Sequence, residues 1–198
     1  VAYVSFQADL FRQIADTSNL QYHAFPAMSV NFLSLNWADP NNPQSAYDEA
    51  GNPIDQGAHP IFSDVAVRKA VVMAFNIDDV LVTLGGEEGG TPLIGAVAPP
   101  VQWAYNNNIE RTPFDPEGAK ALLEEAGWVD TDGDGVREKD GVPLAFTITY
   151  SNILQHFETT ALVAQDQLED VGFDVELELI EWANYITEVY NGQAYDAT

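Results

Sequence analysis

The chain of 198 residues contains no cysteine and very few basic residues. The missing thiols exclude disulfide bonds, thiolate metal sites and a cysteine nucleophile, but they do not fix the compartment. Only seven Lys and Arg residues stand against 31 Asp and Glu, which gives a formal net charge of −24. Because such a surface repels phosphate groups, nucleic acid and anionic lipid head groups are excluded as partners. The sequence also lacks any run of about 18 apolar residues, the minimum for a membrane-spanning helix.

What the sequence does contain is enough apolar material for a folded core. Hydrophobic residues make up 46% of the chain, and they include 10 Phe, 8 Tyr and 4 Trp. This composition argues against disorder. The length suits one large domain, or one lobe of a larger protein.

Three stretches show apolar residues at helical spacing, and each is predicted to be a helix. They cover residues 64–75, 78–84 and 116–126. Asp64 is expected to cap the first helix, and Arg68, one turn further on, is expected to form an ion pair with it.

Residues 37–60 are expected to form a long loop, because proline, glycine and asparagine are concentrated there. A loop of this length is either a surface excursion or a functional flap. Before it, residues 20–25 and 30–36 are expected to pair as a hairpin that follows a short helix over residues 9–15.

The last third of the chain predicts a β-α-β unit over residues 142–180. Apolar residues alternate over residues 142–150 and 173–179, as in half-buried strands, and recur every three or four positions over residues 157–171. A connection of this kind makes the two strands parallel. The predicted fold class is therefore α/β, with a mixed sheet flanked by helices.

Two further elements are expected after this unit. Residues 182–190 form a helix, and residues 195–198 begin another strand. Because the sequence ends inside that strand, we expect the chain to be cut from a longer polypeptide.

An aspartate-rich segment at residues 130–135 matches the first half of a calcium-binding loop. Alternating aspartates on a tight turn direct their carboxylates at one point. A complete loop of the EF-hand type would place glutamate where Gly141 stands, so other ligands would have to replace it. The candidate ligands are Asp130, Asp132, Asp134, Val136, Glu138 and Asp140. The alternative is a hairpin turn held by hydrogen bonds from the aspartate side chains, without a metal.

Several short motifs follow one another along the chain. They are Phe62-Ser63-Asp64-Val65-Ala66-Val67-Arg68-Lys69-Ala70, Trp103-Ala104-Tyr105, Phe114-Asp115-Pro116-Glu117, Ala126-Gly127-Trp128, Gly172-Phe173-Asp174-Val175-Glu176 and Tyr195-Asp196. Each is weak alone, but the ordered set resembles the family 5 extracellular solute-binding proteins, which include dipeptide-, oligopeptide- and nickel-binding members.

The resemblance implies a fold of the type II periplasmic-binding-protein kind, in which two lobes close on a ligand. The whole chain resembles the second lobe only, truncated at its C-terminus, and the loop over residues 37–60 departs from the family. In the family, the segment beyond Tyr195-Asp196 often carries an acidic residue for the amino terminus of a peptide.

The resemblance also implies a function and a location. The protein would bind a peptide or another small solute as a monomer, deliver it to the membrane permease of an ABC importer, and have no enzymatic activity. It would lie outside the cytoplasm, in the periplasm or at the cell surface, where a lipoprotein anchor would hold the full-length form. No cofactor is required, and a structural Ca²⁺ is a candidate only through the aspartate-rich segment.

Four residues are candidates for contacts with the ligand. The resemblance places Trp182 at the cleft between the lobes, and Tyr185, one turn along, shares its face. Asn152 and His156 follow the first predicted strand, and in open α/β sheets ligands bind at the carboxyl ends of strands. The alternatives are a tryptophan that packs against the start of its own helix and a histidine with a purely structural place there.

Two other functions remain open. An acidic, calcium-binding interaction module would fit the charge and the aspartate-rich segment. A carboxylate-based hydrolase would need one acid with a raised pKa opposite a second acid, and the acidic residues lie mostly on exposed faces or in loops. The three histidines, His23, His59 and His156, are not accompanied by a Gly-x-Ser-x-Gly motif, and no catalytic residue is proposed.

Overall fold

The computed structural model describes residues 30–85, 90–93, 95, 97, 101, 103–106 and 108–198, together with Ile14 and Thr17. Contacts divide the chain into two compact units, residues 1–32 with 77–111, and residues 33–76 with 112–198. The expected helix over residues 9–15 and the first half of the expected hairpin, residues 20–25, lie outside the described residues.

In the first unit, the described helix is α3 (Ile77–Thr83), close to the predicted range. It carries Asp78 and Asp79 in its first turn, where acidic side chains favour the helix dipole. Asp78 also accepts two hydrogen bonds from the guanidinium of Arg111, at 3.1 and 3.2 Å. None of the helices in the described part of the chain is long and apolar enough to cross a bilayer.

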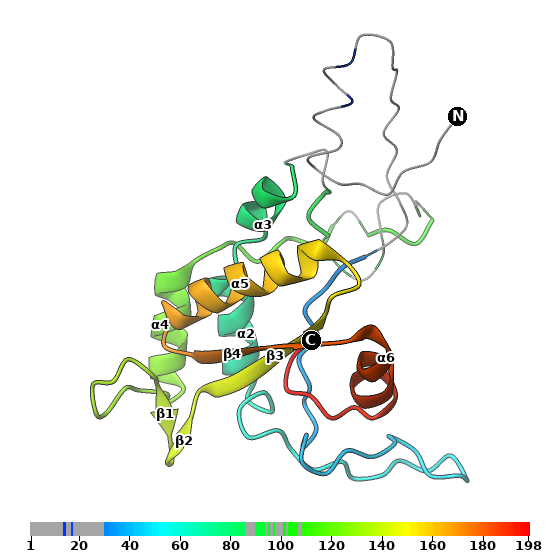
Figure 1. Cartoon of the computed structure of the whole chain (residues 1–198). Helices are drawn as coiled ribbons and strands as arrows, with labels where there is room; N and C mark the ends of the chain where they lie inside the picture. The colour runs from blue at the N-terminus through cyan, green and yellow to red at the C-terminus, as the bar shows by residue number, and fades with distance from the viewer. Residues whose placement is uncertain are drawn as a thin grey trace. The chain divides into compact units, whose positions relative to one another are not determined.

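The second unit contains the strands of the described part of the chain (Figure 1). All of the candidate site residues fall within its ranges. Its elements, in chain order, are α2 (Val65–Ala74), α4 (Pro116–Glu125), β1 (Glu138–Lys139), β2 (Val142–Pro143), β3 (Ala145–Ser151), α5 (Gln155–Glu169), β4 (Asp174–Ile180), α6 (Trp182–Tyr185) and the π-helical segment η2 (Ile186–Asn191) that continues α6.

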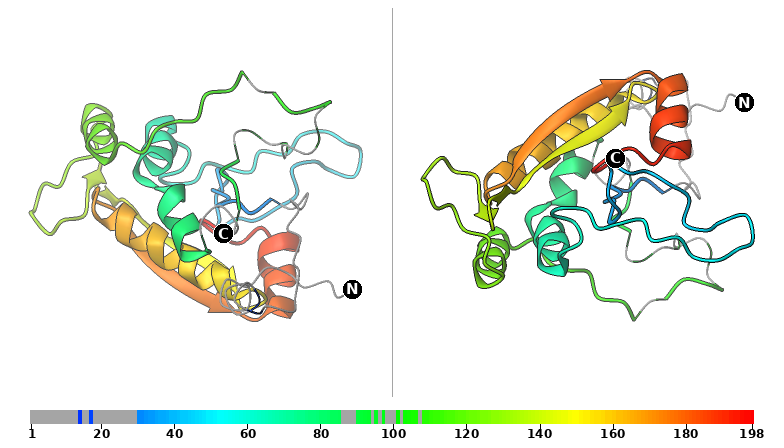
Figure 2. Two further views of the ribbon diagram at one scale, coloured as in Figure 1. Left: turned by 90° about the horizontal axis from the view of Figure 1, so that it is seen from above. Right: turned by 90° about the horizontal axis from the view of Figure 1, so that it is seen from below.

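The predicted β-α-β unit is confirmed as β3, α5 and β4. The two strands are parallel, with register from Ala145 opposite Asp174 to Ser151 opposite Ile180, and α5 covers one face of the pair (Figure 2). Its first strand starts later than predicted, because Val142 belongs to β2. That short strand pairs antiparallel with β1, and Asp140 and Gly141 take positive φ at the turn between them.

The last residues of the chain, 195–198, extend the sheet beside β3 and are called the tail strand here. Ala197 lies in a parallel bridge with Ile148 and in an antiparallel bridge with Leu35. The predicted mixed sheet is thereby confirmed: β4, β3 and the tail strand run parallel, and residues 34–36 run antiparallel to the tail strand. Residues 34–36 therefore pair with the tail strand, at the far end of the sequence, and their expected pairing with residues 20–25 falls outside the description.

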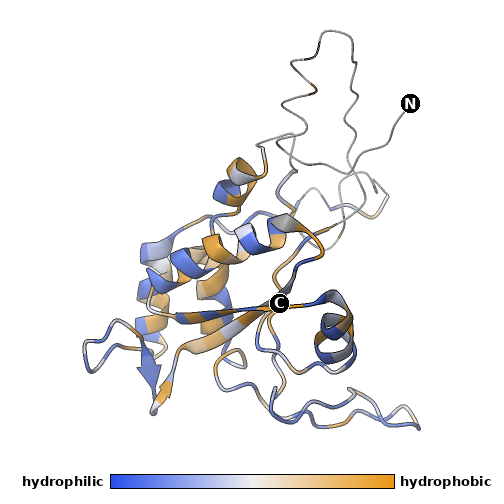
Figure 3. Ribbon diagram, in the orientation of Figure 1, coloured by the Kyte–Doolittle hydropathy of each residue, from blue (hydrophilic) through white to orange (hydrophobic). Residues whose placement is uncertain are grey.

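The core of this unit lies between the sheet, α5 and α2. Phe146 of β3 is at its centre, with its ring edge-on to Phe62 at 4.9 Å and to Phe173 at 5.9 Å between centroids. Edge-to-face pairs of this kind add to the free energy gained by burial. Figure 3 shows hydrophobic residues along α2, four of which are buried, and hydrophilic ones on β1.

Asp64 fixes the start of α2. Its Oδ1 accepts a hydrogen bond from the backbone N–H of Ala66 at 2.8 Å, and Oδ2 accepts from the indole of Trp128 at 3.1 Å and from Lys139 at 3.3 Å. Burial by itself would raise the pKa of Asp64, but these three donors outweigh it and hold the pKa below its ordinary value of 3.8.

The expected ion pair between Asp64 and Arg68 is wrong. The guanidinium of Arg68 donates to the carbonyl oxygens of Phe62 and Ser63, and it lies 4.4 Å from the ring centroid of Trp37. The carboxylate of Asp64 is already engaged by other donors, so Arg68 gains more from the carbonyls and the indole face.

Replacing Asp64 with asparagine tests the lowered pKa. Asparagine keeps an oxygen for the cap but loses the charge, so we expect the variant to be less stable at neutral pH. Because the native pKa is depressed, the stabilisation from the charge is present above the ordinary value and is lost as the pH falls through the lower, folded-state value. The difference in urea midpoint between the wild type and Asp64→Asn should therefore shrink as the pH is lowered from neutral to about 3. A constant difference over this range would contradict the assignment.

Two leucines of α5 provide a matched test of the packing. Leu168 is fully buried, with 0% of its surface exposed, whereas Leu162 on the same helix is 51% exposed. Leu168→Ala should lower the free energy of unfolding by about 2–5 kcal/mol, and Leu162→Ala by no more than about 0.5 kcal/mol, in urea denaturation. Equal effects of the two substitutions would show that α5 does not pack on the sheet as described.

Candidate functional site

Three parallel strands end at one edge of the sheet in the second unit. β3 ends at Ser151, β4 ends at Ile180, and the tail strand reaches Thr198. Because these strands run in the same direction, their carboxyl ends meet at this edge, which is where open α/β sheets bind ligands. We call it the carboxyl edge.

Trp182 and Tyr185 lie together at this edge, on the helix that directly follows β4. Their rings stack, with centroids 5.7 Å apart and planes inclined by 13°. Trp182 is 44% exposed, and Tyr185 is half-buried beneath it. An accessible indole backed by a second ring offers a flat apolar surface with one hydrogen-bond donor.

Tyr185 is anchored to the ends of two strands. Its hydroxyl lies 2.6 Å from Oγ1 of Thr198, and that hydroxyl in turn donates to the backbone carbonyl of Thr149 in β3 at 2.7 Å. The aromatic pair is therefore connected by hydrogen bonds to the tail strand and to the centre of the sheet.

Asn152 lies on the connection between β3 and α5, and His156 lies in the first turn of α5. Asn152 is exposed, and the hydroxyl of the buried Ser151 before it accepts the N–H of Ile153 at 3.2 Å. The half-buried ring of His156 packs edge-on to Phe157 at 4.8 Å. Burial lowers the pKa of His156, which favours the neutral ring and hydrogen bonding over pairing with a charged carboxylate.

The structure thus places all four predicted ligand residues on segments that follow strands at the carboxyl edge. It brings Trp182 and Tyr185 into direct contact, and it places Asn152 on the connection after β3 and His156 at the start of α5. Their roles toward a ligand stay predictions.

The aspartate-rich segment forms an exposed loop before β1. One carboxylate oxygen from each of Asp130, Asp132 and Asp134 lies within 4.8 Å of the others. Each aspartate also accepts backbone N–H bonds inside the loop. They run from Gly133 and Gly135 to Asp130, from Asp134 to Asp132 and from Val136 to Asp134. These backbone hydrogen bonds are the ones expected of a turn without a metal. The convergence of the three carboxylates is the arrangement that a bound cation would need.

The remaining predicted metal ligands take other positions. Glu138 lies in β1, where its carboxylate accepts the N–H and the hydroxyl of Thr131, and Asp140 lies at the turn that follows. Among the described residues, neither belongs to the group of converging carboxylates, which consists of the three aspartates. Val136 contributes its N–H to Asp134.

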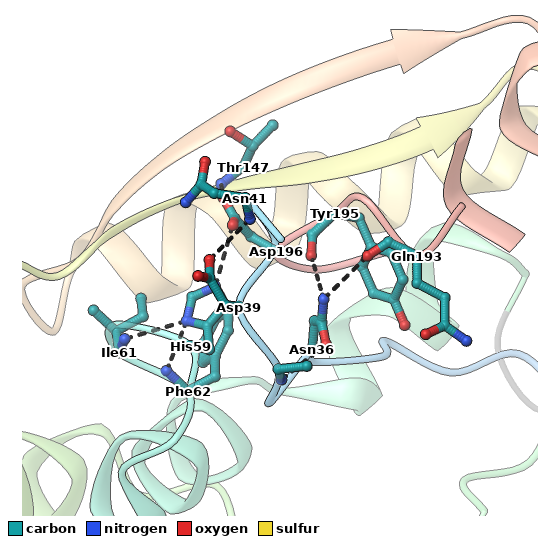
Figure 4. Close-up of polar contacts among 11 residues, drawn as sticks. Asn36, Asp39, Asn41, His59, Ile61, Phe62, Thr147, Gln193, Tyr195 and Asp196 are labelled. Carbon is teal, nitrogen blue, oxygen red and sulfur yellow. Dashed lines mark hydrogen bonds and ion pairs between the residues drawn. The ribbon is translucent and has the colours of Figure 1, made fainter. Parts of the chain in front are cut away.

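The sequence did not reveal a pair formed by the buried His59 and the half-buried Asp196 (Figure 4). His59 is 3% exposed, and its Nε2 lies 3.1 Å from Oδ1 of Asp196. The second oxygen of Asp196 accepts the backbone N–H of Thr147 in β3 at 3.0 Å. Burial by itself would raise the pKa of Asp196, but the bonds from His59 and Thr147 outweigh it and hold the pKa below its ordinary value of 3.8.

A second long-range contact fixes the start of the tail strand and the residues just before it. The side-chain amide of Asn36 donates to the carbonyl oxygens of Tyr195 at 2.9 Å and Gln193 at 3.3 Å (Figure 4). No periodic pattern points to such contacts, because the partners lie more than 130 residues apart. The one local feature in the sequence that could have drawn attention to His59 is its position before Pro60, at the end of a polar loop and just before a helix.

Comparisons with known proteins identify the family of the chain. The family described as "Bacterial extracellular solute-binding proteins, family 5 Middle" matches the chain over residues 1–198. The oligopeptide-binding protein AppA of Bacillus subtilis is 30% identical over 131 residues, which are 65% of this chain and 24% of that protein. The nickel-binding periplasmic protein of Escherichia coli is 34% identical over 119 residues, which are 58% of this chain and 22% of that protein.

The fold is also found among solved structures. Lactococcal OppA, complexed with an endogenous peptide in the closed conformation, matches with a TM-score of 0.78 at 22% identity, over 96% of this chain and 35% of that one. At this identity the likeness shows the fold alone, which is the α/β lobe of a type II periplasmic binding protein.

The chain spans about a quarter of the length of the curated relatives that it matches. The match to the family nevertheless extends along the whole chain, and the fold agrees with it. The chain therefore belongs to family 5 of the bacterial extracellular solute-binding proteins.

Proposed function

We propose that this chain is one lobe of an extracytoplasmic protein that binds an oligopeptide, or another small solute, for an ABC importer. The observation that carries the proposal is the accessible Trp182–Tyr185 stack at the carboxyl edge of the sheet. The names of the family's relatives, which include oligopeptide-, dipeptide- and nickel-binding proteins, support the choice of ligand.

In this proposal the stacked rings provide an apolar platform for a ligand side chain. The hydroxyl of Thr198 and the carbonyl of Thr149 support the platform from the sheet through their hydrogen bonds. A second lobe would close over the ligand, and contacts from both lobes would shift the population toward the closed form that the permease recognises. Asn152, on the connection after β3, and His156, at the start of α5, would reach a different part of the ligand.

Binding without catalysis is supported by the direction of the pKa shifts. A carboxylate-based hydrolase needs an acid whose pKa is raised. The carboxyl groups with a shifted pKa in the described part of the chain are Asp48, Asp64 and Asp196, and all three are lowered. They are held as anions by donors, which suits structural roles.

Calorimetry with a mixed peptide pool tests the ligand and the platform together. The complete two-lobed protein should bind measurably, and this chain alone weakly or not at all. In the complete protein, Trp182→Ala should weaken binding about ten-fold or more, because it removes the apolar face.

The matched control is Tyr190→Ala, which removes a 75% exposed aromatic side chain from the adjoining segment η2 and should leave affinity unchanged. Binding by this chain alone as tight as that of the complete protein would contradict the closure of two lobes. Unchanged affinity in Trp182→Ala would show that the Trp182–Tyr185 stack is not a platform for the ligand.

We further propose that the loop with Asp130, Asp132 and Asp134 holds a structural Ca²⁺, which the convergence of the three carboxylates supports. Ca²⁺ should raise the thermal midpoint of the chain relative to EDTA, because a ligand bound only by the folded state stabilises it. Asp132→Asn should abolish this rise.

The control for charge removal is Asp166→Asn at an exposed position on α5, which should leave the response to Ca²⁺ intact. A thermal midpoint that is the same in Ca²⁺ and in EDTA would leave the loop as a metal-free turn.

A further inference from the structure

We propose that His59 and Asp196 are positioning residues for the ligand platform, acting through Thr198 on the Trp182–Tyr185 stack. This inference rests on the proposed function for its consequence in binding. Its structural content is independent of any ligand: the pair of His59 and Asp196, outside the platform, fixes the strand that holds Tyr185 in place.

The hydrogen bonds of His59 define its tautomer. Its Nδ1 accepts the backbone N–H groups of Ile61 at 3.2 Å and Phe62 at 3.0 Å, so this nitrogen carries a lone pair. In the neutral ring the proton then lies on Nε2, which donates to Asp196. The ring is also packed against Phe62, with centroids 4.7 Å apart. His59 therefore has one orientation and presents one donor to the tail strand.

Asp196 transmits this position to the sheet. One carboxylate oxygen is bound by His59 and the other by the N–H of Thr147, so the carboxylate joins the end of the loop over residues 37–60 to β3. Bonds to a charged, partly buried acceptor are stronger than neutral ones, and leaving such a charge without donors is costly. The tail strand is held in register by this carboxylate as well as by its backbone bonds.

Asp196 and Thr198 flank Ala197, whose backbone N–H and carbonyl bond to Thr147 and Thr149 of β3. Ala197 itself is buried in the core, with 0% of its surface exposed. A shift of the tail strand at Asp196 therefore moves Thr198 with it.

The bonds at Thr198 have a defined direction. Its single hydroxyl proton is used in the bond to the carbonyl of Thr149, so the hydroxyl of Tyr185 donates to Oγ1 of Thr198. The ring of Tyr185 is fixed at its outer end by this bond and across its face by the stack with Trp182. The path from His59 to the platform is thus continuous: His59, Asp196, Thr198, Tyr185, Trp182.

Asp196→Asn is a sharp perturbation of this path. The amide has nearly the same shape as the carboxylate, but it has one acceptor and one donor group. Whichever way it is turned, its NH₂ faces either the Nε2–H of His59 or the N–H of Thr147, and two donors cannot bond to each other. His59 cannot change tautomer to accommodate it, because its Nδ1 already faces two N–H groups.

The test is a double-mutant cycle read out at the indole of Trp182 without ligand. The N–H signal of this indole in ¹⁵N NMR spectra is assigned by its loss in Trp182→Phe. Asp196→Asn should shift the signal, and so should Thr198→Val, which removes the hydroxyl and leaves the bonds of Asp196 in place. In the Thr198→Val background, Asp196→Asn should shift the signal much less, because the connection to Tyr185 is already broken.

Additive shifts in the cycle would overturn the proposal, as would an Asp196→Asn protein that is destabilised while the Trp182 signal stays where it is. If Asp196→Asn does not fold, Asp196→Glu serves in its place, since it keeps both acceptors and the charge but lengthens the side chain. The NMR cycle with Asp196→Glu supports or overturns the proposal by the same results.

Peptide calorimetry on the complete protein separates this inference from the proposed function. Asp196→Asn and Thr198→Val should each weaken binding several-fold, with little further loss when they are combined. If the wild-type protein binds no peptide, the proposed function fails, and the NMR cycle still decides whether the pair positions the platform. If the wild type binds and the two variants bind equally well, positioning is refuted and the proposed function stands.

Discussion

The carboxylate of Asp196 is the interaction on which the second unit depends. It lies in a half-buried position, where an anion is costly unless donors surround it. Two donors do so, one from His59 at the end of a long loop and one from the backbone of β3. The charge therefore stabilises the fold only when loop, strand and tail strand meet in one arrangement. Three segments distant in sequence are fixed together by one side chain.

The carboxyl edge follows from this constraint. Without the tail strand, β3 and β4 would be a two-stranded pair, with one side of β3 unpaired. With it, β3 becomes a central strand whose carbonyls and N–H groups are used on both sides, and a third carboxyl end is added to the edge. Thr198 then lies where its hydroxyl can bind both Thr149 and Tyr185. The same strand that completes the sheet also completes the support of the aromatic platform.

What the sequence could predict was local. Alternation gave β3 and β4, helical spacing gave α2 and α5, and aspartate spacing gave the converging carboxylates, because each pattern is written within a few neighbouring residues. The contact between His59 and Asp196 spans 137 positions and leaves no such pattern. The error at Arg68 has the same origin. Helical spacing places Asp64 within reach of Arg68. In the fold, however, the carboxylate of Asp64 accepts hydrogen bonds from Trp128 and Lys139, which lie far along the chain.

The few basic residues show why the net charge bears on recognition. Five of the seven have structural partners: Arg68, Arg111, Lys120, Arg137 and Lys139. Arg137, for example, donates to the carbonyls of Trp128 and Val171 and so joins the loop after α4 to the end of α5. Cations used in this way leave most of the 31 acidic residues uncompensated. The electrostatic field of this chain therefore attracts cations and repels anions.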